Sequence, residues 1–284
     1  TSIEFDHADI YRDLDHVTEA FVRLLRLVPA GGPVLASADF PRVEKALYKT
    51  ARPAERFGVA QTAEWRPERI RDEGGRTCFD VRFQGRAEGE VSMRLMGEMN
   101  VRNALGVFAL CRRLGLAADA IGDGIESFRG VRRRQEVLVD RPVTVIDDFA
   151  HHPTAIAGTL EAVRRRHPGR RLWAVFEPRS NTSRRRVFQR DFPAALGGAD
   201  RVVLAEVFFK ETDVLAPAER LSVADIVAEL HARGHEARTC PTADEILDHL
   251  RREVADGDVV VFMSNGAFGG APQRFAASVR ERRG

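Results

Sequence analysis

The second half of this chain alternates short apolar runs with longer amphipathic stretches, and no other feature of the sequence constrains the fold as strongly. The apolar runs are of strand length and lie at residues 143–146, 172–176, 202–204, near 237 and at 259–263. Each is followed by a stretch with helical periodicity, at residues 154–166, 184–196, 223–233, 244–252 and 272–280. Short apolar strands that alternate with helices predict a mostly parallel sheet covered on both faces.

The first 130 residues show a different order of patterns. Apolar residues recur every three or four positions between Val17 and Val28, which predicts an amphipathic helix, and residues 34–36 are a candidate buried strand. From residue 56 to 96 the alternation has period two, which predicts an antiparallel ribbon. Helices are expected at 97–114 and 119–128. The change near Gly130 predicts an α/β protein of two domains, residues 1–130 and 131–284.

The composition excludes several classes of protein. Lys and Arg number 44 and Asp and Glu 42, so the net charge of +2 supplies no strong field toward nucleic acid or anionic lipid. No apolar run approaches the ~18 residues of a membrane span. The three cysteines are far apart, which indicates a reducing compartment and no structural zinc. We therefore expect a cytoplasmic protein that binds neither nucleic acid nor membrane.

Polar clusters follow three of the predicted strands. They are Asp147-Asp148-Phe149-Ala150-His151-His152, Glu177-Pro178-Arg179-Ser180-Asn181-Thr182 and Ser264-Asn265-Gly266. Ligands of parallel α/β sheets bind beyond the carboxyl ends of the strands, so we expect the three clusters to converge on one edge. A carboxylate can hold a ribose diol, an arginine can hold a carboxylate, and hydroxyl or backbone N–H groups at a helix start favour anions. A helix cap, a surface ion pair and a simple turn remain alternatives for these clusters.

Two further features bear on phosphate chemistry. Glu4, Asp6, His7 and Asp9 crowd the start of the chain, and such a group suits a divalent cation that is shared with phosphates, although a polar loop is equally compatible. A Walker loop has a glycine directly before its lysine, and none of the three lysines satisfies this. This chain by itself therefore has no Walker loop with which to bind the β- and γ-phosphates of a nucleotide.

Four segments, taken in order, resemble motifs of the Mur ligases, the ATP-dependent amide-forming enzymes of peptidoglycan assembly. They are Ile3-Glu4-Phe5-Asp6-His7-Ala8-Asp9, Gly97-Glu98-Met99-Asn100-Val101-Arg102-Asn103, Gly130-Val131-Arg132-Arg133-Arg134 with Glu136, and Asp148-Phe149-Ala150-His151. In the family these segments bind magnesium, contact adenine, join two domains and contact ribose, respectively. The resemblance covers essentially the whole chain.

The resemblance implies an architecture and a reaction. A Mur ligase has an N-terminal domain for the UDP-sugar, a central domain with a P-loop for ATP, and a Rossmann-like C-terminal domain that brings in the amine. Residues 1–130 would be the last part of the central domain and residues 131–284 the C-terminal domain, with the N-terminal half of the enzyme missing. ATP and Mg²⁺ would convert a carboxylate to an acyl phosphate, which the amine then attacks.

Within the family, the segments at 4–10, 147–156, 177–182 and 263–270 are most similar to the branch that recycles murein peptides. That branch joins UDP-N-acetylmuramate to the tripeptide L-alanyl-γ-D-glutamyl-meso-diaminopimelate. The alternatives are the ligase that adds L-alanine to the same nucleotide sugar, and a non-catalytic fragment that binds nucleotide or peptide. The isolated chain is expected to be inactive.

The resemblance also assigns roles to individual residues. The metal ligand and first catalytic residue would be His7, and a second catalytic residue would be His151. ATP would be bound by Asn100, Asn103, Arg134 and Asp148, and the acceptor substrate by Arg179, Asn181, Ser264 and Asn265. The sequence departs from the family at Ser2, which replaces the usual Asn, and at Met99, which replaces the usual His.

Two rival hypotheses belong to other classes of protein. Runs of arginine at 132–134, 164–166 and 184–186 raise the possibility of a nucleic-acid-binding module, but no aromatic platform accompanies them. A zinc hydrolase would use His7, His151 and His152. Salt-dependent DNA binding and the zinc content of the purified protein would test these hypotheses.

Overall fold

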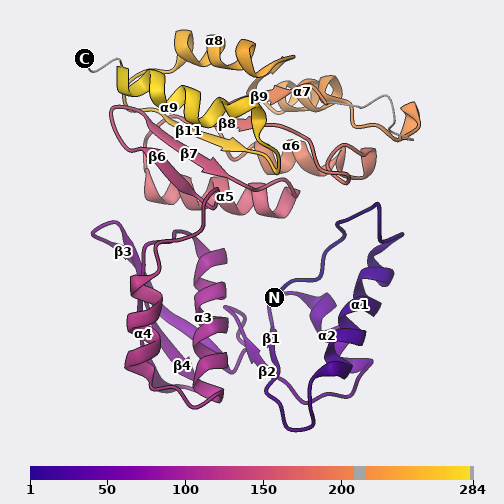
Figure 1. The fold of residues 1–284 in the computed structure, drawn as a ribbon, viewed down its shortest axis with the longest axis vertical. Helices are drawn as coiled ribbons and strands as arrows, with labels where there is room; N and C mark the ends of the chain where they lie inside the picture. Colours follow the sequence, from indigo (N-terminus) through magenta and orange to yellow (C-terminus); the bar gives the residue numbers. More distant parts are fainter. Residues whose placement is uncertain (208–214, 282–284) are drawn as a thin grey trace. The chain divides into compact units, whose positions relative to one another are not determined.

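The computed structural model describes residues 1–207 and 215–281, which form two compact units (Figure 1). The first unit comprises Thr1–Arg129 and the second Gly130–Gly284. Each unit has its own sheet, of five strands in the first and six in the second. Within the described residues, no helix combines the length and the apolar character that a membrane crossing requires.

The first unit consists of a mixed sheet with helices. In chain order the elements are α1 (Leu14–Leu27), β1 (Leu35–Ser37), α2 (Pro41–Tyr48), β2 (Glu55–Phe57), β3 (Trp65–Glu73), β4 (Arg76–Phe83), β5 (Arg86–Met93), α3 (Glu98–Arg113) and α4 (Ala118–Ser127). The strands follow the order β1-β2-β3-β4-β5, in which β1, β2 and β3 are parallel and β3, β4 and β5 antiparallel.

The antiparallel ribbon of the first unit is set by its two tight turns. Gly74 and Gly75 both have positive φ angles, as do Gln84 and Gly85 at the second turn. Two-residue turns with two positive φ angles match the twist of antiparallel strands, which is why they join β3 to β4 and β4 to β5. The inward residues of the ribbon, such as Phe79, pack against α3 in a buried cluster.

The second unit is a doubly wound α/β domain. Its elements are β6 (Glu136–Val139), β7 (Thr144–Asp148), α5 (Pro153–Arg166), β8 (Leu172–Phe176), α6 (Asp191–Leu196), β9 (Arg201–Ala205), α7 (Val223–Ala232), β10 (Glu236–Cys240), α8 (Ala243–Glu253), β11 (Val259–Met263) and α9 (Ala271–Glu281). The strand order is β10-β9-β8-β11-β7-β6, in which neighbouring strands from β10 to β7 are parallel and β6 runs antiparallel to β7. Helices α8 and α9 cover one face, and α5 lies on the other (Figure 1).

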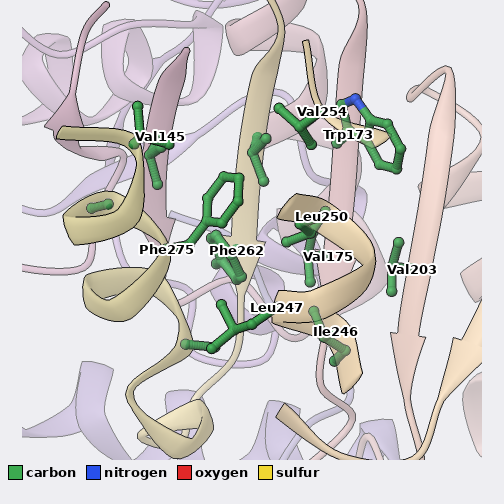
Figure 2. Packing of buried hydrophobic residues seen from close by; sticks show 14 of the residues in the cluster. Val145, Trp173, Val175, Val203, Ile246, Leu247, Leu250, Val254, Phe262 and Phe275 are labelled. Atoms are coloured by element: carbon green, nitrogen blue, oxygen red, sulfur yellow. The ribbon is translucent and has the colours of Figure 1, made fainter. Parts of the chain in front are cut away.

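The core of the second unit explains its apolar strands. β7, β8 and β11 are buried at every position, because helices cover both faces of the sheet. On one face Val145, Val175 and Phe262 meet Leu247 of α8 and Phe275 of α9 (Figure 2). Successive side chains of a strand point to opposite faces, so Asp147 lies on the α9 side of β7 and Asp148 on the opposite side.

Most of the expected elements are confirmed, including the parallel sheet and the antiparallel ribbon. The single helix expected at 184–196 is wrong: a short 3-10 turn at Arg186–Phe188 precedes α6, which starts only at Asp191. Pro193 explains the late start, since proline is tolerated in the first turn of a helix but not in its interior. The elements α2, β2 and β6 are short or half-exposed and carried no clear periodic signal.

Candidate active site

The three polar clusters of the second unit converge, as the sequence predicts. Strands β8, β11 and β7 are adjacent and parallel, so their carboxyl ends share one edge of the sheet. The backbone N–H of Ser264 donates to the carbonyl of Asp148 at 3.1 Å, and that of Glu177 donates to the carbonyl of Met263 at 3.0 Å. The hydroxyl of Ser264 donates to Glu177 Oε2 at 2.5 Å and accepts from the N–H of Gly266 at 2.9 Å.

Asp148 is buried at this edge and holds backbone groups. Its two carboxylate oxygens accept from the N–H of Gln135 at 2.8 Å and of Ala150 at 2.6 Å. Burial raises the pKa of Asp148, and the two backbone hydrogen bonds oppose that rise. The carboxylate thereby ties the segment before β6 to the loop after β7. A ribose would have to use its remaining lone pairs.

The two histidines of this loop have different surroundings. His151 is half-buried, and its Nδ1 lies 2.9 Å from the carbonyl oxygen of Phe149. That contact requires a proton on Nδ1, which in the neutral ring leaves Nε2 as the acceptor nitrogen. The Nδ1 atom of His152 accepts from the N–H of Thr154 at 3.3 Å, so His152 caps helix α5. His152 therefore has a structural role here.

Two of the predicted substrate residues, Arg179 and Asn181, lie in the segment that follows β8. The side chain of Arg179 is 45% exposed and lies 3.4 Å from Glu177 Oε1. The Arg179 side chain packs directly over Gly266. A Cβ atom built on Gly266 would lie only 2.1 Å from Arg179 Cδ. Asn181 is exposed, and its Oδ1 accepts from Arg184 at 3.0 Å.

Asn265 lies in the same loop as Ser264 and Gly266. Its Oδ1 atom is buried and has no hydrogen-bond partner within the described parts of the chain. A buried acceptor without a donor is costly, so this oxygen suits a ligand that brings an N–H group. The amine of an acceptor substrate has that chemistry.

The first residues of the second unit include two neighbouring arginines of different character. Arg134 is exposed, and its guanidinium lies 4.8 Å from the ring centroid of Phe149. Arg133 is largely covered and donates through Nη2 to the carbonyls of Ser264 and Gly266, each at 2.5 Å. The sequence motifs assign a role to Arg134 and none to Arg133, because nothing in a run of three arginines distinguishes the one that folds inward. Glu177 likewise received no individual role, although it belongs to one of the three polar clusters.

In the first unit, the expected adenine-contacting asparagines border an apolar pocket. The pocket lies between α3 and α4, has a volume of about 430 Å³ and is lined by residues that include Asn100, Asn103, Ile121 and Ile125. The amide of Asn100 donates to the carbonyl of Met96 at 2.9 Å. An apolar lining that includes two asparagine side chains suits a flat heterocycle such as adenine. Met99, which directly precedes Asn100 in α3 and replaces the expected His, is 37% exposed.

The expected magnesium ligand His7 lies at the start of the first unit. It is exposed, and its backbone N–H donates to Asp6 Oδ1 at 2.7 Å. Among residues 1–207 and 215–281, no three His, Cys, Asp or Glu side chains form a group able to hold a metal ion. The residues present therefore fit magnesium only as a single contact, with phosphates and waters as the other ligands.

Comparison with known families identifies the class of protein that this fold and this sheet edge define. The model of the Mur ligase middle domain matches residues 1–111, and that of the Mur ligase glutamate ligase domain matches residues 133–266. The chain belongs to the Mur ligase family, whose members are ATP-dependent amide-bond ligases of peptidoglycan synthesis.

Individual relatives carry two acceptor specificities. The UDP-N-acetylmuramate–L-alanine ligase of Salinibacter ruber is 34% identical over 97% of this chain. Among solved structures, the murein peptide ligase of Psychrobacter arcticus is 28% identical, covers 95% of this chain and has a TM-score of 0.65. The UDP-N-acetylmuramate–alanine ligase of Thermotoga maritima, 24% identical over 98% of this chain with a TM-score of 0.75, shares the fold.

The chain spans about three-fifths of the length of these relatives. It matches 58% of the Salinibacter ruber ligase, 55% of the Psychrobacter arcticus protein and 58% of the Thermotoga maritima protein. The curated relatives favour the L-alanine alternative over the murein-recycling hypothesis that the sequence motifs suggested.

Proposed function

We propose that this chain supplies part of the ATP site and the acceptor site of a ligase that forms an amide on the muramate carboxylate of UDP-N-acetylmuramate. The observation that carries the proposal is the convergence of Asp148, Glu177 and Ser264 on one sheet edge of a Mur ligase C-terminal domain. Residues 1–130 would complete the central ATP-binding domain, and a preceding part of the protein would bring the UDP-sugar and the phosphate loop.

The proposed roles follow the chemistry of each side chain. Adenine would occupy the pocket beside Asn100 and Asn103, and Arg134 would neutralise phosphate charge from its exposed position. His7 would contribute one ligand to a magnesium ion held mainly by phosphates and water. That ion would offset the charge that develops as phosphate is transferred.

On the acceptor side, Arg179 would present its exposed guanidinium to a substrate carboxylate, and Asn181 of the same segment would bind the substrate as well. Ser264 and Asn265 would position the amine, and His151 would lie near it. The reaction would take place in the cytoplasm, where ATP and nucleotide sugars are available.

Two acceptors compete in this proposal. L-Alanine is supported by the names of the curated relatives at 34% identity, which is the stronger line of support. The tripeptide is supported by the exposed Arg179 in the segment 177–182 and by the 28% identity to a murein peptide ligase. A peptide with several carboxylates would use such an arginine more fully than a single amino acid.

The test is a ligation assay on the full-length protein encoded by the gene that contains this sequence. Phosphate release is measured with ATP, Mg²⁺ and UDP-N-acetylmuramate, and with either L-alanine or the tripeptide as acceptor. A preference in kcat/KM for one acceptor assigns the enzyme to that branch of the family, and absence of release with both would refute the proposal. The isolated 284-residue chain is the matched control and should release no phosphate.

A further inference from the structure

Arg133 connects the nucleotide side of the sheet edge to its acceptor side. Its guanidinium Nη2 donates to the carbonyls of both Ser264 and Gly266. Its Nε lies 3.7 Å from Asp147 Oδ1, and its guanidinium carbon lies 5.3 Å from the centre of the Phe149 ring. One side chain thus contacts the loop after β11 and the residues that end β7.

The backbone of Arg133 is fixed as firmly as its side chain. Its φ angle is +59°, in the left-handed region, which is costly for a residue with a Cβ atom. The N–H donates to Glu136 Oε2 at 2.8 Å, and the carbonyl accepts from the N–H of Phe149 at 2.7 Å. This strained conformation persists because partners on both sides hold it, and it directs the side chain to the 264–266 loop.

The loop that Arg133 holds carries the groups assigned to the acceptor. Ser264 is hydrogen-bonded to Glu177, and the Arg179 side chain packs across Gly266. Displacement of the 264–266 backbone would therefore move Ser264, Asn265 and Arg179 together. Asp148, on the nucleotide side, accepts from the N–H of Gln135, two residues after Arg133.

We propose that Arg133 is a positioning residue, which fixes the 264–266 loop and thereby sets the affinity of the enzyme for its acceptor substrate. It acts through the two carbonyls and need not touch substrate. Lysine cannot replace it fully, because an ammonium lacks the planar fork that reaches two carbonyls and Asp147 at once. This inference rests on the proposed function for its kinetic consequence, but the positioning itself can be measured without any activity.

The first experiment uses the 284-residue chain. Hydrogen exchange of the amides at residues 264–267 is compared between wild type and Arg133→Met, with Arg132→Met as the control, since Arg132 is its exposed neighbour. Loss of a charged hydrogen bond should speed exchange in this loop about tenfold in Arg133→Met and leave it unchanged in Arg132→Met. Exchange in the loop that is equal in all three proteins overturns the positioning claim. If Arg133→Met does not fold, Arg133→Lys replaces it and should show a smaller increase of the same sign.

The second experiment uses the full-length ligase. Arg133→Met should raise KM for the acceptor about tenfold while KM for ATP and for UDP-N-acetylmuramate stays within about twofold of wild type, and Arg133→Lys should recover part of the loss. A parallel rise in all three KM values, or a pure loss of kcat, would indicate a general structural role and overturn the inference. If the wild-type enzyme does not ligate at all, the proposed function fails, and the exchange measurement alone decides the positioning claim.

Discussion

At the scale of single residues, the observed position of the Arg179 side chain requires a glycine at residue 266. A Cβ atom on Gly266 would lie 2.1 Å from Cδ and 2.6 Å from Nε of Arg179. The obstacle is a flexible side chain and not backbone, so a larger residue would displace Arg179 instead of unfolding the loop. The sequence predicts a turn or a binding site at residues 264–266, but only the structure shows that the Arg179 side chain packs over Gly266.

We therefore expect Gly266→Ala to move Arg179 at little cost in stability. The free energy of unfolding should change by less than about 1 kcal/mol, because the side chain that must move is half-exposed. The Nε–H resonance of Arg179 in an NMR spectrum, assigned with Arg179→Lys, should shift markedly, since its approach to Glu177 is lost. An unshifted resonance would show that the arginine does not lie over Gly266.

A second residue-scale prediction concerns Asp147, whose pKa is raised by burial against the opposing effect of Arg133. The folded chain then keeps this proton at a pH where the unfolded chain, with a pKa near 3.8, has released it. Stability contributed by Asp147 must therefore fall as pH rises from about 4 to its folded pKa. The stability of Asp147→Asn relative to wild type should rise over this window and level off above it. Urea unfolding at a series of pH values measures this, with the exposed Asp256→Asn as control; a relative stability that falls with pH would contradict the sign.

At the scale of elements, local chemistry explains which segments the sequence predicted well. The strands β7, β8 and β11 are short, fully apolar runs, and the turns of the ribbon contain glycines at positive φ. These signals are local and strong. β6 depends on its pairing with β7, and the region before α6 depends on a turn stabilised by hydrogen bonds between Ser180 and Ser183. Sequence periodicity encodes neither contact.

Helix α5 offers a direct test of element stability. Gly158 lies inside this helix, and nothing lies within 4 Å of a Cβ atom built on it. Gly158→Ala should therefore raise the free energy of unfolding by about 0.5–1 kcal/mol, because alanine loses less backbone entropy in a helix. Urea unfolding measures the change, and a destabilised variant would mean that the space around Gly158 is occupied. In contrast to Gly266→Ala, this substitution should leave the Arg179 resonance in place.

At the scale of the whole molecule, three hydrophobic clusters among the described residues each consist of residues from a single unit. The cluster of Figure 2 extends from Val139 to Val279, and the other two lie within residues 3–125. A core of this kind is what an independently folding domain requires. The chain has two tryptophans, and each unit contains one of them, Trp65 in the first and Trp173 in the second.

This distribution predicts that residues 130–284 fold alone. The fragment should unfold cooperatively in urea, followed by the fluorescence of Trp173, which is buried and donates to Asp258 at 3.0 Å. The same signal in the full chain carrying Trp65→Phe provides the reference. A fragment that lacks a cooperative transition would show that the second unit requires the first.

The sequence by itself determined the fold class, the ribbon and the set of residues gathered at one sheet edge, because strand length, glycine turns and the carboxyl ends of parallel strands are local signals with fixed geometric consequences. Tertiary structure alone decided which polar groups in that set are exposed and which are buried. Asp148 and Arg133 are covered and hydrogen-bonded to loop backbone, whereas Arg179 and Arg134 are exposed. The sequence does not distinguish adjacent residues of the same type, such as Arg133 and Arg134. The physical reason is that burial and hydrogen bonding depend on neighbours distant in the chain, such as Ser264 for Arg133, over 131 residues.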